Sequence, residues 1–267
     1  MNISNTEMQS LKDNGFLIKK NVFNINQIEK IKKIIKLNPE GRNRKNYFPI
    51  NFKAFLVKAI KFDFKKIINS LYLLNIKKKL KLDLTADIFF EKKSKLIQLD
   101  AYYNSTNKKE ILPWHSDQSL NHPVRPENFP SPDLFYLKFF FYLTNVGSKN
   151  GCTSYIGGSH KITHIVRECI YENKIEYRPF WNLKDLVSLI TDSKNYEIIA
   201  EKLGSKTLVE SFLKKAKIAE DDKNSEIFDF NADPGDLLIF NEGGLHKGSQ
   251  PATNERIALR YLYTTFF

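Results

Sequence analysis

The sequence predicts a mainly β fold, a jelly-roll barrel with bracing helices, in one domain that spans all 267 residues. Apolar residues recur at helical spacing over much of the first 82 positions, and after Asp83 the spacing changes to the alternation that is typical of strands. Strand-like segments return near the C-terminus, over residues 233–267. Strands that return in this way bring residues far apart in the chain together, as in a jelly roll.

The region 1–82 is predicted to be mostly helical and to brace the barrel. The pattern predicts a helix over Thr6–Asn14, and the apolar triplet Phe16–Ile18 predicts a short extended segment after it. Asn24 begins a capping-box pattern that marks the start of a second helix. From Ala54 to Leu82, apolar residues continue at helical spacing with lysines between them, which indicates one or two helices packed outside a sheet.

Residues 83–160 and 233–267 are predicted to supply the barrel strands. The strand-like segments are 85–91, 95–104, 134–146, 152–156, 237–240 and 257–267. The segment 95–104 alternates most clearly and places Gln98, Asp100 and Tyr102 on one face. Such a polar face indicates either contact with solvent or, in a strand covered on both sides, a wet or metal-bearing cavity.

Residues 161–232 are predicted to form a helical insertion or lid between two barrel segments. The insertion mixes basic and aromatic side chains, among them Arg167, Lys174, Arg178 and Trp181. Loops at the mouth of a barrel often carry binding residues, and this mixture would suit a polar or anionic small molecule. A helical cap that only shields the barrel explains the same pattern equally well.

The formal net charge is +12, and most of it comes from lysine. A basic balance of this size is compatible with nucleic acid, an anionic membrane or a phosphorylated substrate. The lysines are spread along the chain, which favours solvated helix faces; only Lys77–Lys81 and a loop with Arg42, Arg44 and Lys45 form local clusters. We expect no nucleic-acid partner, while peripheral membrane contact and the oligomeric state stay open.

The cysteines and the apolar segments indicate a cytoplasmic protein. Cys152 and Cys169 are too few for a disulfide framework and suit a reducing compartment. Residues 1–12 are polar and lack the apolar core of a signal peptide. The longest apolar stretch, Leu134–Leu143, is interrupted by Lys138 and is too short to cross a bilayer.

A His-x-Asp pair at His115 and Asp117 is the strongest indication of chemistry in the chain. On an extended segment two such side chains point the same way, so they can hold two positions of a metal ion. His246, after the Gly-Gly turn that follows a predicted strand, is the candidate for a third position, and Arg256 lies ten residues beyond it. Two histidines and one carboxylate on one face of an octahedron are typical of non-haem Fe(II) oxygenases.

Four segments in this order resemble the phytanoyl-CoA dioxygenase family of Fe(II)/2-oxoglutarate-dependent oxygenases. They are Asn14–Ile18, Pro113–Asp117, Asn150–Lys161, and Gly235–Phe240 with the histidine and arginine that follow it. The third segment is the most specific match, although the family usually has proline where this chain has Gly157. The resemblance covers most of the chain.

The resemblance implies a double-stranded β-helix, a cupin-like core with iron between its two sheets. It implies that the iron ligands are His115, Asp117 and His246, that Arg256 binds the distal carboxylate of 2-oxoglutarate, and that Thr153 and Gln98 help to hold this co-substrate. The family's serine after the distal histidine is displaced here to Ser249. Whether Ser249, Tyr102 or Lys138 lines the site is left open by the sequence.

The function expected from the sequence is hydroxylation of a small, polar or anionic metabolite by an Fe(II)/2-oxoglutarate-dependent dioxygenase. Such an enzyme uses O2 and releases succinate and CO2. Two alternatives are a jelly-roll hydrolase or isomerase that binds zinc or manganese, and a non-catalytic binding protein on the same fold. Arg256 argues against the first, which needs no clamp for a co-substrate carboxylate, and the intact ligand set argues against the second.

Overall fold

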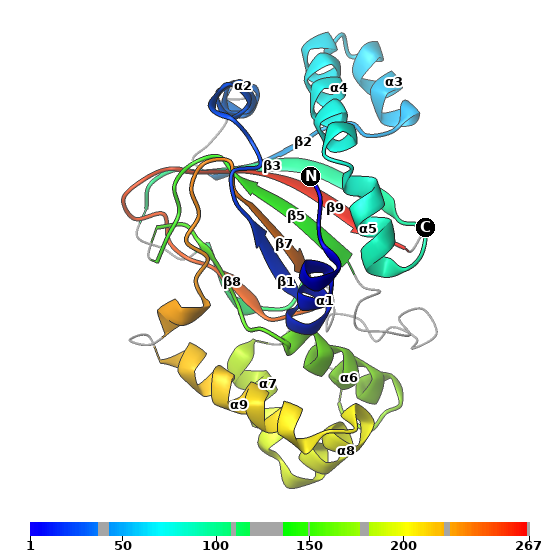
Figure 1. The fold of residues 1–267 in the computed structure, drawn as a ribbon, viewed down its shortest axis with the longest axis vertical. Helices are drawn as coiled ribbons and strands as arrows, with labels where there is room; N and C mark the ends of the chain where they lie inside the picture. The colour runs from blue at the N-terminus through cyan, green and yellow to red at the C-terminus, as the bar shows by residue number, and fades with distance from the viewer. Residues whose placement is uncertain are drawn as a thin grey trace.

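Two antiparallel sheets form the centre of the protein, seen in a computed structural model that describes residues 1–36, 43–107, 111–117, 136–148, 150–176, 182–221 and 225–265 (Figure 1). In spatial order the large sheet consists of β1 (Phe16–Lys19), β7 (Leu237–Asn241), β5 (Tyr136–Tyr142), β9 (Arg256–Thr264), β3 (Lys95–Asn104) and β2 (Asn43–Tyr47). The small sheet consists of β4 (Leu112–His115), β8 (His246–Gly248) and β6 (Thr153–Tyr155). Neighbouring strands come from distant parts of the chain, which confirms the predicted jelly roll.

Helices from the N-terminal region cover one face of the large sheet (Figure 1). They are α1 (Asn5–Asn14), α2 (Ile25–Lys36), α4 (Phe64–Lys79) and α5 (Leu82–Phe90), whereas α3 (Phe52–Ile60) packs on α4 and has no buried residue. Alternate strand residues such as Leu99, Phe139 and Tyr261 point toward these helices and form the main hydrophobic core. The polar residues of β3 and β9 therefore face the other way, toward the small sheet.

The segment 85–91 is a helix, so its prediction as a strand was wrong. Its buried residues are Leu82, Thr85, Ala86, Phe89 and Phe90, which recur at intervals of three and four, as on one face of a helix. Its aromatic and β-branched residues resemble those of a strand, but packing of that face against the core decides the conformation. As a result the described residues contain more helix than the term mainly β implies.

The insertion folds into α6 (Ser159–Tyr171), α7 (Leu183–Thr191), α8 (Ser193–Leu203) and α9 (Lys206–Glu220), followed by the 3-10 helix η3 (Ser225–Phe228). These helices share a second hydrophobic core with Trp114 and Leu245, the residues just before two of the candidate metal ligands. They thus cover the outer face of the small sheet, below the sheets in Figure 1. Arg178 and Trp181 lie outside the described residues, and Arg167 is buried.

Among the residues that the structure describes, no helix is long and apolar enough to cross a bilayer.

Candidate metal centre

The small sheet brings the three predicted metal ligands together. β4 ends at His115, β8 begins at His246, and these two residues are paired across the sheet. Asp117 follows two residues after His115, and its backbone N–H donates to the carbonyl of Glu242 at 3.2 Å. One potential ligand atom from each of the three side chains lies within 4.8 Å of the other two, which is close enough for all of them to hold one ion.

The two imidazoles are oriented as metal ligands require. Nδ1 of His115 is 2.7 Å from the carbonyl of Pro113, and Nδ1 of His246 is 2.9 Å from that of Gly244. Each Nδ1 therefore carries the proton, and each Nε2 turns its lone pair toward Asp117, at 3.3 and 3.4 Å. Nε2 of His115 is buried and has no hydrogen-bond partner among the described residues.

The protonation states of these groups suit a cation. Burial lowers the pKa of His246 to about 4, so its Nε2 is free at neutral pH. Burial alone would raise the pKa of Asp117, but the ammonium of Lys138, 2.9 Å away, helps to hold it well below its usual value. The neutral imidazole of His246, the imidazole of His115 and a carboxylate together fit a divalent metal ion of the Fe(II) type.

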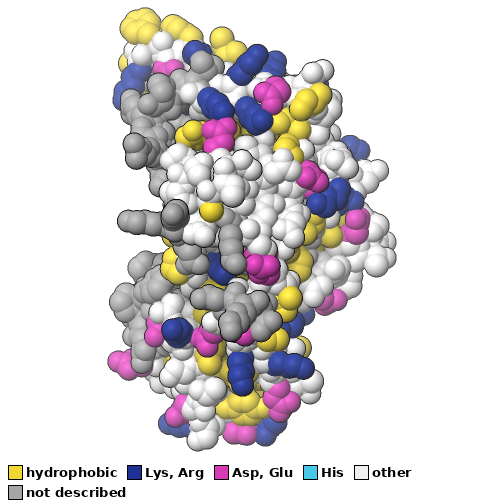
Figure 2. Space-filling view, turned by 90° about the vertical axis from the view of Figure 1, so that its left-hand side faces the viewer, with side chains coloured by type: hydrophobic (Ala, Val, Ile, Leu, Met, Phe, Trp, Pro, Cys, Tyr) yellow, Lys and Arg dark blue, Asp and Glu magenta, His cyan; other side chains and the backbone are white. Residues whose placement is uncertain are grey.

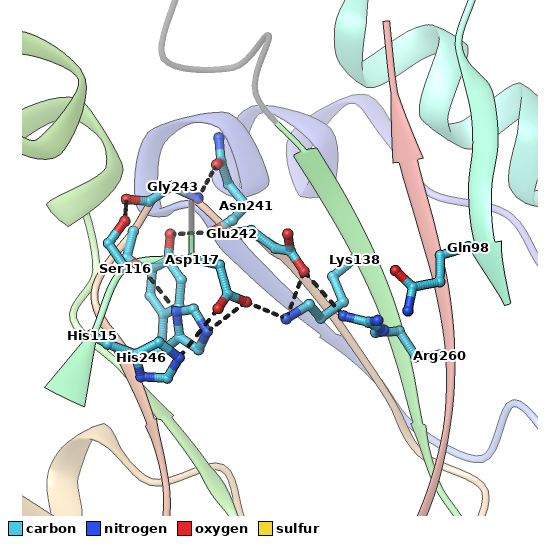
Figure 3. A network of polar contacts seen from close by, with 12 residues as sticks. Gln98, His115, Ser116, Asp117, Lys138, Asn241, Glu242, Gly243, His246 and Arg260 are labelled. Carbon is cyan, nitrogen blue, oxygen red and sulfur yellow. Dashed lines mark hydrogen bonds and ion pairs between the residues drawn. The ribbon is translucent and has the colours of Figure 1, made fainter. Parts of the chain in front are cut away.

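A chain of buried charges extends from Asp117 away from the histidines (Figure 3). Lys138 Nζ lies 2.7 Å from Glu242, and Glu242 lies 3.4 Å from Nη1 of Arg260. Arg260 in turn donates two hydrogen bonds to Asp100, at 2.7 and 2.8 Å. The chain alternates acidic and basic groups, so each charge has a partner of opposite sign inside the protein.

Glu242 is the member of this chain that the sequence analysis missed. It is fully buried after β7, and burial raises the pKa of Glu242 although Lys138 and Arg260 favour its ionised form. The one signal in the sequence was its position two residues after the predicted apolar strand 237–240 and just before the Gly-Gly turn that leads to His246. Lys138, left open by the sequence, contacts a candidate metal ligand.

A cavity of about 290 Å³ lies between the two sheets and contains all three candidate ligands. Its other lining residues are Gln98, Tyr102, Ile111, Leu112, Lys138, Phe140, Thr153, Phe240, Glu242, Lys247, Gly248, Arg256, Arg260 and Leu262. Every site residue predicted from the sequence thus lines one space. Ser249 is not in this set; its hydroxyl lies 3.3 Å from the thiol of Cys152.

Arg256 marks one end of the cavity. Its guanidinium lies over the ring of Phe140, 5.1 Å from the centroid, and Nη1 is 3.4 Å from Asn104. Its Nε is buried and has no hydrogen-bond partner within the described part of the chain. Gly151 leaves room for this arginine. Its φ is +75°, and a Cβ at this position would lie 3.1 Å from the Arg256 side chain.

Thr153 lies near the same end. Its hydroxyl accepts a hydrogen bond from Tyr142 at 2.7 Å, and its N–H donates to the same tyrosine oxygen at 3.2 Å.

Gln98 occupies the opposite end, beside Asp100, to which its amide donates at 2.8 Å. On β9, Gln98 pairs with Leu262, whereas Arg256 pairs with Asn104. Six residues of strand between Gln98 and Asn104 correspond to roughly 20 Å. The strand register therefore separates Gln98 from Arg256, so the two do not contact the same carboxylate of a molecule as short as 2-oxoglutarate.

Comparison with protein families bears on this arrangement directly. The sequence profile described as Phytanoyl-CoA dioxygenase (PhyH) matches residues 11–258, which is most of the chain. The chain belongs to the phytanoyl-CoA dioxygenase family. It is an oxygenase that depends on Fe(II) and 2-oxoglutarate, with O2 as the second co-substrate. No curated protein matches its sequence.

Solved structures of similar fold support the architecture. HygX from Streptomyces hygroscopicus with nickel and 2-oxoglutarate bound has 17% identity and a TM-score of 0.54, covering 100% of this chain and 89% of HygX. EctD from S. alaskensis has 13% identity and a TM-score of 0.56, covering 98% and 77%. The epimerase SnoN, in complex with Fe3+, alpha ketoglutarate and nogalamycin RO, has 11% identity and a TM-score of 0.54, covering 97% and 82%. At these identities the likeness establishes the shared fold.

Proposed function

We propose that this oxygenase hydroxylates a small anionic metabolite, with iron bound by His115, Asp117 and His246 and the distal carboxylate of 2-oxoglutarate bound by Arg256. The observation that carries the proposal is a pair of unmet polar groups in one cavity. They are the free Nε2 of His115 at the candidate metal site and the unpartnered Nε of Arg256 at one end. A buried polar group without a partner is costly, and a bound ligand supplies the partner.

Arg256 is a better candidate than Arg260 for binding the carboxylate of 2-oxoglutarate, because Arg260 is already paired with a carboxylate of the protein. Arg256 and Arg260 are both buried, and both line the cavity. Arg260 makes a bidentate pair with Asp100, whereas the contacts of Arg256 are a ring and one long hydrogen bond. A planar guanidinium with free N–H groups suits bidentate recognition of a carboxylate.

The protein's part in the reaction is to bind, orient and exclude water. When bound, iron and 2-oxoglutarate activate O2 and convert a C–H bond of the substrate to C–OH, with release of succinate and CO2. The carbonyls of Pro113 and Gly244 fix the imidazoles, and Lys138 fixes the carboxylate of Asp117. In this proposal Thr153 contacts the co-substrate on the Arg256 side, and Gln98 contacts the substrate at the other end.

The charges that line the cavity support an anionic substrate. Four basic side chains line it, Lys138, Lys247, Arg256 and Arg260, against two carboxylates, Asp117 and Glu242. Asp100 balances Arg260, and the dianionic co-substrate balances a divalent iron, so the four basic side chains exceed the three carboxylates by one positive charge. A concave site of one sign attracts ligands of the opposite sign. Lys247 is a candidate substrate contact; it lies over the ring of Trp114 at 5.4 Å, and Trp114 packs against the core of the helical insertion.

The proposal is tested by anaerobic reconstitution followed by a substrate screen. Fe(II) and 2-oxoglutarate together should give a weak visible charge-transfer band. Carboxylated or phosphorylated metabolites should then accelerate 2-oxoglutarate consumption, and the product should gain one oxygen atom derived from O2. The variant Lys247→Ala should lose much of this stimulation while keeping basal turnover, and Lys184→Ala, in α7, is its control. A neutral lipid as the best stimulant would contradict the proposal.

A further inference from the structure

The hairpin formed by α3 and α4 carries an unusual number of exposed apolar side chains. It projects from the upper end of the molecule, beyond the large sheet (Figure 1). None of the nine residues of α3 is buried. The exposed apolar residues are Phe52, Leu56, Val57, Ile60, Phe62, Phe64, Ile68 and Leu71. Phe52 and Phe62 are 82% and 81% exposed, so these apolar side chains lie on the surface of the folded protein.

Packing within the hairpin does not account for these side chains. The inner face of α4 is satisfied, because Leu73 and Ile76 are buried in the main core. Among the described residues, nothing covers the outer face of α4 and most of α3 in this way. Their larger side chains face solvent on either side of the turn at Phe62. Contiguous exposed apolar surface of this kind usually marks an interaction site.

The same hairpin concentrates the positive charge of the protein. Between Phe52 and Lys81 the sequence has nine lysines and one aspartate, so this stretch carries eight of the twelve net charges. Figure 2, which views the molecule from the side away from the hairpin, shows hydrophobic side chains at the upper end with basic side chains just below them. Lysines therefore occur along the whole sequence, but most of the net positive charge comes from the stretch between Phe52 and Lys81.

This combination identifies the kind of partner. A second copy of the chain would bring two such basic surfaces together, which like-charge repulsion opposes. A nucleic acid would satisfy the lysines but leaves large aliphatic and phenyl groups without an apolar environment. An anionic lipid surface satisfies both, because acyl chains take the apolar residues and headgroups attract the lysines.

We propose that the α3–α4 hairpin docks the enzyme on an anionic membrane surface. Phe52, Ile60 and Phe62 enter the boundary between headgroups and acyl chains, and lysines such as Lys61 and Lys65 contact the headgroups. Interfacial helices of this type reach roughly 5–10 Å into the bilayer and bind reversibly. The surface lies outside the cavity, so binding does not depend on the substrate or on the proposed function.

Co-sedimentation of the iron-loaded enzyme with lipid vesicles tests the proposal. One set of vesicles is pure phosphatidylcholine, and the other contains about one third phosphatidylserine; salt is varied from low to high. We expect binding to the anionic set only, weakening by at least about tenfold as surface charges are screened. The triple variant Phe52→Ser, Ile60→Ser, Phe62→Ser and the double variant Lys61→Glu, Lys65→Glu should each lose at least about tenfold in partitioning.

Matched controls lie on the helical insertion and before β7. Leu208→Ser with Ile227→Ser removes exposed apolar side chains, and Lys214→Glu with Lys217→Glu reverses exposed charges. Both controls should bind vesicles like the wild type, and all variants should keep 2-oxoglutarate turnover, which reports an intact fold.

Three outcomes would overturn the proposal. The first is a wild-type protein that stays in solution with both vesicle sets. The second is a serine variant that binds as tightly as the wild type, since lipid insertion would then contribute nothing. The third is a wild-type dimer in sedimentation velocity that the serine variant converts to monomer, because the apolar surface would then be an interface between copies of the chain.

Discussion

The two ends of the cavity differ in whether their polar groups already have partners. At one end Arg260, Asp100, Glu242 and Lys138 form ion pairs of 2.7–3.4 Å. At the metal site and around Arg256, by contrast, buried nitrogen atoms have no hydrogen-bond partner among the described residues. The ion-paired groups need no ligand, whereas the unpaired nitrogen atoms gain partners only when a metal ion or a co-substrate binds. The contrast separates residues that hold the site in place from residues that bind.

The largest effect should come from the metal ligands. His115→Ala or His246→Ala removes one of three donors, and even outer contacts of metal ligands are worth about tenfold to a hundredfold in affinity. We expect iron content after anaerobic reconstitution to fall from one ion per chain to near zero. His164→Ala is the control, since His164 is buried beside Glu168 and outside the cavity. Normal iron content in both ligand variants would remove the basis of the assignment.

Arg260→Gln should act mainly on stability. The variant removes the bidentate cationic partner of the buried Asp100, and breaking a buried ion pair costs about 3–5 kcal/mol in the free energy of unfolding. Denaturant titration of the wild type and the variant measures this loss. The affinity for 2-oxoglutarate should change far less. If that affinity instead falls more than in Arg256→Gln, then Arg260 is the clamp, and the contrast between the two ends is reversed.

Arg256→Gln should weaken the binding of 2-oxoglutarate and leave the stability of the fold largely unchanged. Its charge-assisted bonds to the co-substrate carboxylate are worth about 1.5–3 kcal/mol, so the dissociation constant for 2-oxoglutarate should rise roughly tenfold to a hundredfold. Iron binding should persist, and the free energy of unfolding should change little because the arginine has no ion-pair partner in the described residues. Anaerobic titration of the charge-transfer band gives the dissociation constant, metal analysis gives the iron content, and denaturant titration gives the free energy of unfolding.

Gly151→Ala should have the smallest effect, again at the Arg256 end. The alanine is strained at a φ of +75°, and its methyl group presses on the arginine side chain from 3.1 Å. Gly204→Ala is the matched control, with a φ of +66° and open space around the added carbon. Both variants should lose about 1–2 kcal/mol of stability. Only Gly151→Ala should weaken 2-oxoglutarate binding, by a few fold; equal binding in both variants would mean that Gly151 does not position Arg256.

The sequence predicted the binding residues better than the residues that support them. His115, Asp117 and His246 sit in short motifs, and alternation along β3 gave a polar face, which in the structure lines the cavity and does not face solvent. The Lys138–Glu242–Arg260 chain joins three strands that are distant in sequence, so no local pattern indicates it. Similarly, α5 was mistaken for a strand because only its packing, and not its composition, selects the helix.

The backbone bridge between His115 and Asn182 ties the metal site to the helical insertion. Trp114, next to the ligand, also donates to the carbonyl of Ala219 at 3.2 Å and packs in the core of the insertion. An ion that cross-links β4 to β8 therefore also restrains the start of α7 and the end of α9. By linkage, iron at a hundred times its dissociation constant adds about 2.7 kcal/mol to the folded state. Amide exchange in these helices should slow when iron binds, so the insertion would report the occupancy of a site that it does not line.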